Sequence, residues 1–221
     1  MRALPVRSDL IPLILLGALW VVMSALVNPV GDFPLNDDWR YALAVKSILE
    51  TGRFELPYPG APNVFAQAYW GALFCLPFGF SFTALRFSTL TLGAAGIFAL
   101  YLLLREIGAG RWIALLGGLT LAVNPLYFAL AQTFMTDVPL LALLIAALWL
   151  FVRGVQREET ASVVAGILIA LIAILIRQFA LLLLLAFSVA YLIRNGWTRQ
   201  ALAVAILPLL LGPSFLRDSI T

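Results

Sequence analysis

Long apolar runs recur along the whole chain, and they constrain its fold more than any other feature. A helix needs about 20 apolar residues to cross the ~30 Å hydrocarbon core of a bilayer. Hydrophobic residues make up 63% of the sequence and charged residues 11%, whereas soluble domains are about 45–50% apolar and about 25% charged. The pattern therefore predicts an integral membrane protein, an all-α polytopic helical bundle of about seven transmembrane helices. The predicted spans are 10–27, 87–104, 112–130, 139–152, 161–176, 179–193 and 201–216.

Composition excludes several kinds of site. The chain has no histidine, which removes His-based catalysis and His-ligated metals, and its single Cys75 excludes a disulfide framework or a zinc cluster. Acid–base chemistry must then come from the 11 Asp and Glu residues. The net charge of +3 reflects arginines in loops and suggests no nucleic-acid partner.

The N-terminal run predicts the orientation. Arg2 and Arg7 precede the span at 10–27, and no small-residue cleavage site follows it. We therefore expect an uncleaved signal-anchor with its N-terminus in the cytoplasm, in the plasma (inner) membrane. The first external loop is then 28–86 and the second is 131–138.

The first loop opens with an unusual polar stretch, Asn36-Asp37-Asp38-Trp39-Arg40-Tyr41. Asn36 is a good N-cap, the two carboxylates fit the first helical turn, and the apolar repeat that follows stops at Gly52. This predicts a short amphipathic helix on the membrane surface. The apolar stretch 64–82 is interrupted by polar residues and glycines, and the positive-inside rule favours a re-entrant or interfacial segment over a span.

Two acidic sites are candidates for chemistry. Asp37 and Asp38 could act as a general base and its partner, because neighbouring carboxylates raise one another's pKa. Asp137 in the second loop stands alone between two apolar runs. All three could instead be plain helix-start residues. We expect the two acidic sites to face one another across a cleft at one membrane surface.

Two arginines stand beside the predicted spans. Arg177 lies in a tight turn with no charge nearby in sequence, and it needs an anion such as a phosphate or Asp137. Arg86 opens the span at 87–104. For both, an arginine that reaches up to lipid headgroups is the alternative.

The order of these motifs resembles the GT-C membrane glycosyltransferases, closest to the protein-O-mannosyltransferase and aminoarabinose-transferase branch (glycosyltransferase family 39-like). Asp37, Asp38 and Tyr41 match its first-loop Asp-Glu-x-x-Tyr motif, and Asp137 in Thr136-Asp137-Val138-Pro139 matches its second-loop acid. The resemblance makes residues 1–221 one GT-C-like module.

What the resemblance implies is transfer of a sugar from a polyprenyl-phosphate donor to a lipid, glycan or protein acceptor on the external face, with inversion. Asp37 is the expected base, Asp38 and Asp137 shape the pocket, and Arg177 and Arg86 hold the lipid phosphate. Relatives often have a lysine before the proline at 62, where this chain has alanine, so Asn63 or Gln67 would compensate together with Arg86. No cofactor is certain, although Asp38 and Asp137 could hold a divalent cation through waters.

Relatives are usually about twice as long, so the resemblance also implies a second subunit or a C-terminal half. A non-catalytic protein that binds a lipid-linked sugar with a partner remains an alternative. A small transporter is another alternative, although acids at helix ends and the absence of repeats count against it.

Overall fold

The structure, a computed structural model, describes residues 6–56 and 63–196, and these are helical throughout their regular parts. Four segments in this part of the chain are long and apolar enough to cross a membrane. They are α1 (Val6–Val27), α4 (Phe82–Glu106), α7 (Asp137–Arg157), and the short η1 (Gln178–Ala180) followed directly by α9 (Leu181–Asn195). Large apolar side chains remain exposed on their outer faces, such as Ile14 at 58% and Leu182 at 64%. Exposed apolar surface of this extent is typical of a protein whose solvent is lipid, and the chain is a multi-pass membrane protein.

The predicted span 112–130 is not one continuous helix. It is divided into α5 (Arg111–Ala122) and α6 (Pro125–Ala131), which meet at an angle of 61°. Asn124 causes the break, because its Oδ1 accepts hydrogen bonds from the N–H groups of Leu126 and Tyr127, both at 3.0 Å, and Pro125 takes the first helical position. Counted as one broken span, the pair brings the described part of the chain to five candidate spans.

The remaining predicted spans are not established. Helix α8 (Thr160–Ile174) is apolar but has 15 residues, fewer than the about 20 that cross a bilayer. The predicted span 201–216 lies outside the described residues. Within the described residues the structure thus gives four or five candidate spans, where the sequence predicted six.

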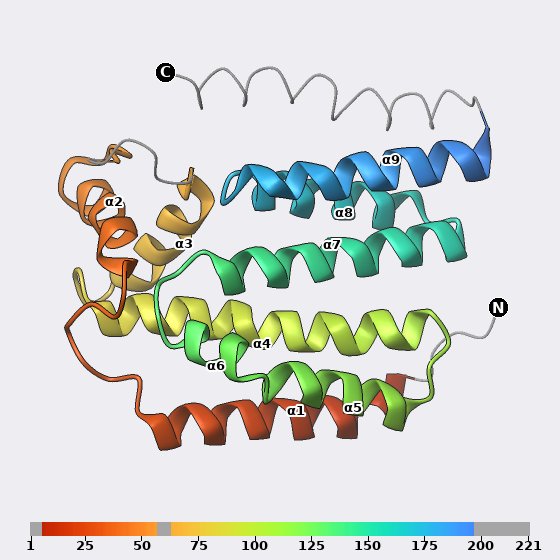
Figure 1. Cartoon of the computed structure of the whole chain (residues 1–221), viewed down its shortest axis with the longest axis horizontal. Helices are drawn as coiled ribbons and strands as arrows, with labels where there is room; N and C mark the ends of the chain where they lie inside the picture. The colour runs from red at the N-terminus through yellow and green to blue at the C-terminus, as the bar shows by residue number, and fades with distance from the viewer. Residues whose placement is uncertain (1–5, 57–62, 197–221) are drawn as a thin grey trace.

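Two short helices lie together at one end of the bundle (Figure 1). Helix α2 (Asp38–Thr51) ends as predicted at Gly52, which has a φ of +72° that glycine adopts without strain. Its N-cap is Asp37 and not Asn36, which has a left-handed φ of +60° instead. Helix α3 (Phe65–Cys75) has 11 residues, too few to cross the membrane, in keeping with an interfacial or re-entrant segment.

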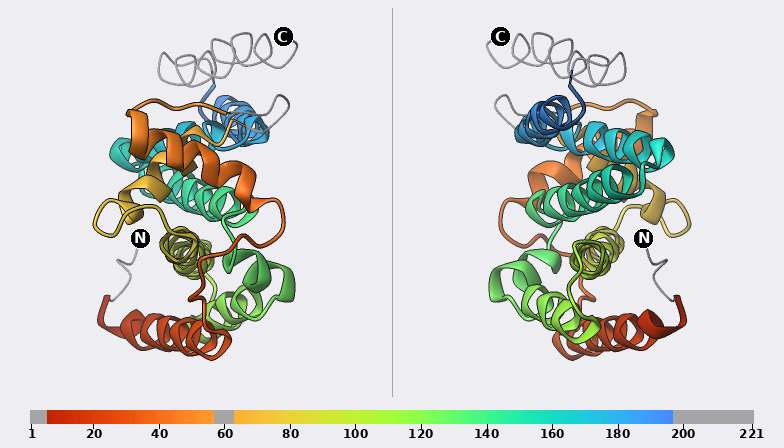
Figure 2. Two further views of the ribbon diagram at one scale, coloured as in Figure 1. Left: turned by 90° about the vertical axis from the view of Figure 1, so that its left-hand side faces the viewer. Right: turned by 90° about the vertical axis from the view of Figure 1, so that its right-hand side faces the viewer.

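Helix α4 lies in the middle of the bundle, between α1 and α5 on one side and α7, α8 and α9 on the other (Figures 1 and 2). Close packing against it depends on Gly96, where a Cβ atom would come within 2.9 Å of the Cβ of Ala142 on α7. Tyr127 on α6 donates a hydrogen bond to the carbonyl of Gly93 at 2.8 Å. These contacts hold α7 and α6 against the middle of α4.

Ion pairs hold the other end of the bundle. Asp9 on α1 accepts hydrogen bonds from Tyr101 at 2.7 Å and from Arg105 at 2.8 Å, and Arg157 on α7 pairs with Glu106 on α4 through two contacts of 2.7 and 3.0 Å. The three long helices are therefore fastened to one another at the end opposite α2 and α3.

Candidate active site

The chain between α1 and α2 is fastened to the start of α4 by Arg86. This side chain is only 2% exposed, and it donates one hydrogen bond to the carbonyl of Pro29 at 3.0 Å and another to the carbonyl of Phe33. The guanidinium also lies over the ring of Phe33. Arg86 is therefore occupied with main-chain carbonyls of the first loop, a different environment from the headgroup or phosphate contact expected from the sequence.

The same loop makes further contacts with the N-terminus of α4. The hydroxyl of Thr83 accepts a hydrogen bond from the N–H of Gly31 at 2.9 Å and donates one to its carbonyl at 3.2 Å. Asp32 accepts one from the N–H of Phe82 at 2.8 Å. Residues 29–33 thus pack against the N-terminus of α4, and this contact places Asp37 and Asp38 at the same end of the bundle.

Asp38 joins the two external loops. Its side chain is fully buried, and its two oxygens accept hydrogen bonds from the N–H of Leu35 at 2.8 Å and from the N–H of Phe134 at 3.2 Å. Burial raises the pKa of the Asp38 carboxyl above its ordinary value, while these hydrogen bonds and the charge of Arg86 act in the opposite direction. Asp38 is therefore a buried link between the loops.

Gln67 on α3 holds the same segment of the second loop. Its amide nitrogen donates hydrogen bonds to the carbonyls of Phe134 at 3.0 Å and Met135 at 3.2 Å, and the side chain is 1% exposed. Helices α2 and α3 therefore both bind residues 134 and 135, shortly before Asp137 begins α7.

Asp137 and Arg177 form a partly exposed ion pair at this end of the bundle. An Nη atom of Arg177 lies 3.4 Å from an oxygen of Asp137, and the two side chains are 27% and 40% exposed. The Nε of Arg177 is buried and has no hydrogen-bond partner among the described residues. The sequence suggested Asp137 or a phosphate as the anion for Arg177, and the structure gives it Asp137.

Arg177 is held beside α3 by main-chain bonds. The N–H of Val64 donates to the carbonyl of Ile176 at 3.3 Å, and the N–H of Ala66 donates to the carbonyl of Leu175 at 3.2 Å. The half-buried Asn63 precedes this junction directly. Arg177, more than 100 positions along the chain, therefore lies close to the segment that carries Asn63 and Gln67.

An apolar groove adjoins this neighbourhood. It has a volume of about 490 Å³ and lies among α3, α4, α7 and α8, with Gln67, Trp70 and Ile176 among its lining residues. Because Ile176 precedes Arg177, the groove and the ion pair lie next to each other.

The two other residues of the first-loop motif, Asp37 and Tyr41, differ from each other in their exposure. Asp37 is exposed at the N-cap of α2 and makes no side-chain capping bond, so its carboxylate is open to a ligand. Tyr41 is 7% exposed and packs in the apolar cluster beneath α2 and α3. Of the two neighbouring acids, Asp37 is therefore exposed and Asp38 is buried.

The described residues contain no group of three or more His, Cys, Asp or Glu side chains placed to bind a metal ion. Both oxygens of Asp38 are occupied by main-chain N–H groups, so this carboxylate would have to leave them to bind a cation.

Sequence reasoning missed two polar residues at this site. Thr136 is fully buried and Gln132 is 7% exposed, yet the hydroxyl of the first and both amide atoms of the second have no hydrogen-bond partner in the described part of the chain. Buried polar atoms normally have partners, so these are candidate ligand contacts. Their position inside a segment that reads as an ordinary loop gave no signal in the sequence.

Comparison with known proteins gives one match. The family described as dolichyl-phosphate-mannose-protein mannosyltransferase matches residues 63–215. The match includes Arg86, Asp137 and Arg177, and it begins after Asp37 and Asp38. Neither the curated proteins nor the solved structures contain a match to this chain.

Proposed function

The chain belongs to the dolichyl-phosphate-mannose-protein mannosyltransferase family, and we propose that it transfers a sugar from a polyprenyl-phosphate donor to an acceptor hydroxyl at the end of the bundle that carries Asp37 and Asp137. The observation that carries the proposal is the partly exposed pair of Asp137 and Arg177, 3.4 Å apart, beside an apolar groove. A cation next in sequence to a lining residue of an apolar groove suits a phosphate that is attached to a long hydrocarbon chain.

Arg177 contacts the donor phosphate in this proposal. Its buried Nε has no partner among the described residues, and its Nη contact with Asp137 is long for a charge-assisted hydrogen bond, which is usually about 2.7–2.9 Å. A phosphate oxygen would accept from the guanidinium in the planar geometry that arginine favours. The first isoprene units of the donor would lie in the groove beside Trp70 and Ile176.

Asp37 is the general base. The acceptor oxygen forms a bond to the anomeric carbon while its proton passes to the carboxylate of Asp37. The bond between the anomeric carbon and the phosphate oxygen breaks, and its electron pair leaves with the lipid phosphate, which Arg177 stabilises. Attack opposite to the leaving group inverts the anomeric carbon.

The other residues position these two. Asp38 links the loop of Asp37 to the loop of Asp137, and Arg86 holds residues 29–33 by their carbonyls. Asn63, Gln67 and Thr136 supply polar atoms for the sugar hydroxyls, and Tyr41 supports α2 from below. We place this end on the external face, with the N-terminus in the cytoplasm, because Arg2 and Arg7 precede α1.

A direct test uses the purified chain in lipid nanodiscs with a labelled polyprenyl-phosphate sugar. Donor binding and donor hydrolysis are measured for the wild type, Arg177→Gln and Asp37→Asn. Arg53→Gln is the control for Arg177→Gln, because it removes an exposed positive charge from the first loop. Glu50→Gln is the control for Asp37→Asn, because it removes an exposed negative charge from helix α2.

Three outcomes separate the readings. Binding with turnover, with binding weakened by Arg177→Gln and turnover abolished by Asp37→Asn, supports the transferase. Binding that depends on Arg177 without any turnover favours the non-catalytic alternative, a protein that needs a partner or further chain. No binding at all would contradict both.

A further inference from the structure

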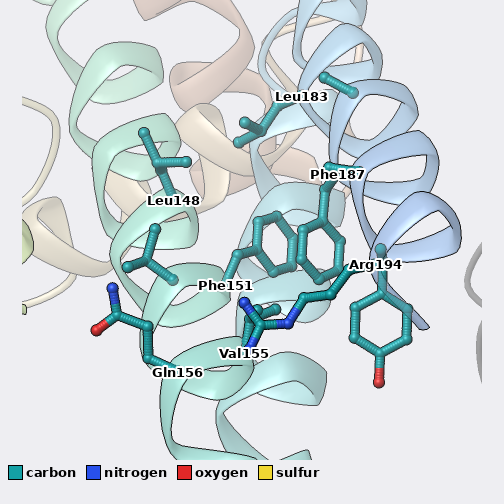
Figure 3. Close-up of a pocket in the computed structure, with 11 residues that line it drawn as sticks. Leu148, Phe151, Val155, Gln156, Leu183, Phe187 and Arg194 are labelled. Carbon is teal, nitrogen blue, oxygen red and sulfur yellow. The ribbon is translucent and has the colours of Figure 1, made fainter. Parts of the chain in front are cut away.

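A second apolar groove lies between α7 and α9, and its polar end is far from the candidate active site. It has a volume of about 480 Å³, within the range of about 300–1,000 Å³ usual for ligand sites. Figure 3 shows its floor, where the rings of Phe151 and Phe187 stack face to face, with centroids 3.8 Å apart and planes within 6°. Leu148 and Leu183 continue the apolar wall away from the aromatic pair.

One end of this groove is polar. Arg194, in the last turn of α9, is exposed and reaches toward Val155 on α7, and Gln156 lies at the same end (Figure 3). Arg194 and Tyr191 also border a neighbouring polar hollow that includes Glu158. Within the described part of the chain, Arg194 makes no ion pair, whereas Arg153 pairs with Glu159 and Arg157 with Glu106.

The length of the groove matches one leaflet of a bilayer. Its residues run from Leu148 to Gln156 on α7 and from Leu183 to Arg194 on α9, which at 1.5 Å per residue is about 12 Å and about 16 Å. Half of a ~30 Å hydrocarbon core is about 15 Å. The polar end lies at the C-terminal ends of both helices, and the apolar end reaches the middle of α7 and the first turn of α9.

The polar end of the groove is separated from the active site by the length of α7. Asp137 begins that helix and Gln156 is its next-to-last residue, so the two ends are about 28 Å apart along the axis. The polar end of the groove therefore belongs to the membrane surface opposite the candidate active site.

We propose that this groove binds one anionic phospholipid, with an acyl chain against Phe151 and Phe187 and its phosphate at Arg194. Arg194 makes no ion pair in the described part of the chain, which favours an anionic headgroup. The apolar floor is about as long as one leaflet, which favours the acyl chain of a membrane lipid. The bound lipid fills the space between α7 and α9 and holds α9 in place.

The test is native mass spectrometry of the full chain, released from membranes that contain phosphatidylglycerol and phosphatidylcholine in equal amounts. Two variants probe the site: Arg194→Gln removes the cation, and Ala190→Phe fills the groove from an exposed position where folding is not at stake. Arg111→Gln is the control, because it removes an exposed arginine at the same end of the bundle away from the groove.

We expect the wild type and Arg111→Gln to retain one phosphatidylglycerol, and both groove variants to retain it at least about fivefold less. Retention that is unchanged in both groove variants overturns the proposal, and so does an equal loss in Arg111→Gln. A wild-type chain that carries no phospholipid, as a monomer or as a dimer, would mean that another part of the chain or a second copy covers the groove, and this also overturns it.

Discussion

Asp38 and Phe134 are 96 positions apart, yet a carboxylate oxygen of the first accepts a hydrogen bond from the main-chain N–H of the second at 3.2 Å. The bond is buried and joins the loop that carries Asp37 to the loop that carries Asp137. Because Gln67 binds the carbonyl of the same Phe134, both polar groups of that peptide position are engaged by side chains from other elements. The relative position of the two acidic sites therefore depends on a few specific bonds, and these can be removed one at a time.

Asp38→Ala should destabilise the protein. It leaves the N–H groups of Leu35 and Phe134 without their acceptor, and each buried donor left unsatisfied costs about 1–3 kcal/mol. We expect the free energy of unfolding to fall by about 2–5 kcal/mol, measured by denaturant or thermal unfolding in detergent. Glu50→Ala, an exposed acid on the same helix, is the control and should change little. Equal stability of the two variants would show that Asp38 is not a link.

The stability contributed by Asp38 should depend on pH. Burial raises the pKa of its carboxyl in the folded protein above the ordinary value of 3.8, so the folded state binds this proton more tightly than the unfolded state. The free energy of unfolding must then decrease as pH rises from about 3.8 through the raised pKa. Asp38→Asn, which does not titrate, lacks this dependence. The unfolding temperature of the wild type minus that of the variant should therefore fall between pH 4 and 7, and a rise would contradict the shift.

Asp37→Asn should abolish sugar transfer without affecting the fold. General-base catalysis contributes about 10²–10⁴-fold, so the turnover rate should drop by at least about 100-fold while donor binding is retained. The exposed position and the absence of a capping bond predict unchanged thermal unfolding. Glu50→Gln controls for loss of a negative charge on α2. Transfer at the wild-type rate would remove Asp37 from the mechanism.

Arg177→Gln should weaken donor binding. A charge-assisted hydrogen bond is worth about 1.5–3 kcal/mol, which corresponds to roughly 10–150-fold in the dissociation constant. Arg177→Lys keeps the charge but not the planar fork, and it should restore binding only in part. Titration of a fluorescent polyprenyl phosphate measures both variants, with Arg53→Gln as control. Full affinity in Arg177→Gln would assign the phosphate to another cation.

The apolar pattern predicted the helical class and most helix positions, because hydropathy reports directly on burial in lipid. It failed at 112–130, where Asn124 and Pro125 carry the ordinary signals of a helix start inside a run that is otherwise apolar throughout. Hydropathy averaged over a window does not register a single N-cap residue, although the dipeptide Asn124-Pro125 is itself a signal of a break.

The candidate site was predictable as a set of residue types and not as an arrangement. Composition and spacing do not distinguish Asp37 from Asp38, because the two are adjacent and chemically identical, and only the family resemblance assigned them different roles. In the structure the start of α2 leaves Asp37 exposed and buries Asp38. The partners of Asp38 and Arg86 are main-chain N–H and carbonyl groups, which every residue carries. Residue identity holds no information about such bonds.

The anchoring of residues 29–33 has an evolutionary consequence. Arg86 donates hydrogen bonds to the carbonyls of Pro29 and Phe33, and Thr83 bonds to the peptide groups of Gly31. Because these bonds are made to the main chain, most of them do not depend on the side chains of residues 29–33. Val30 is 63% exposed, so its side chain can vary without loss of these main-chain bonds. Descendants of this chain can therefore change the surface chemistry of this loop by substitution while inheriting an unchanged backbone frame.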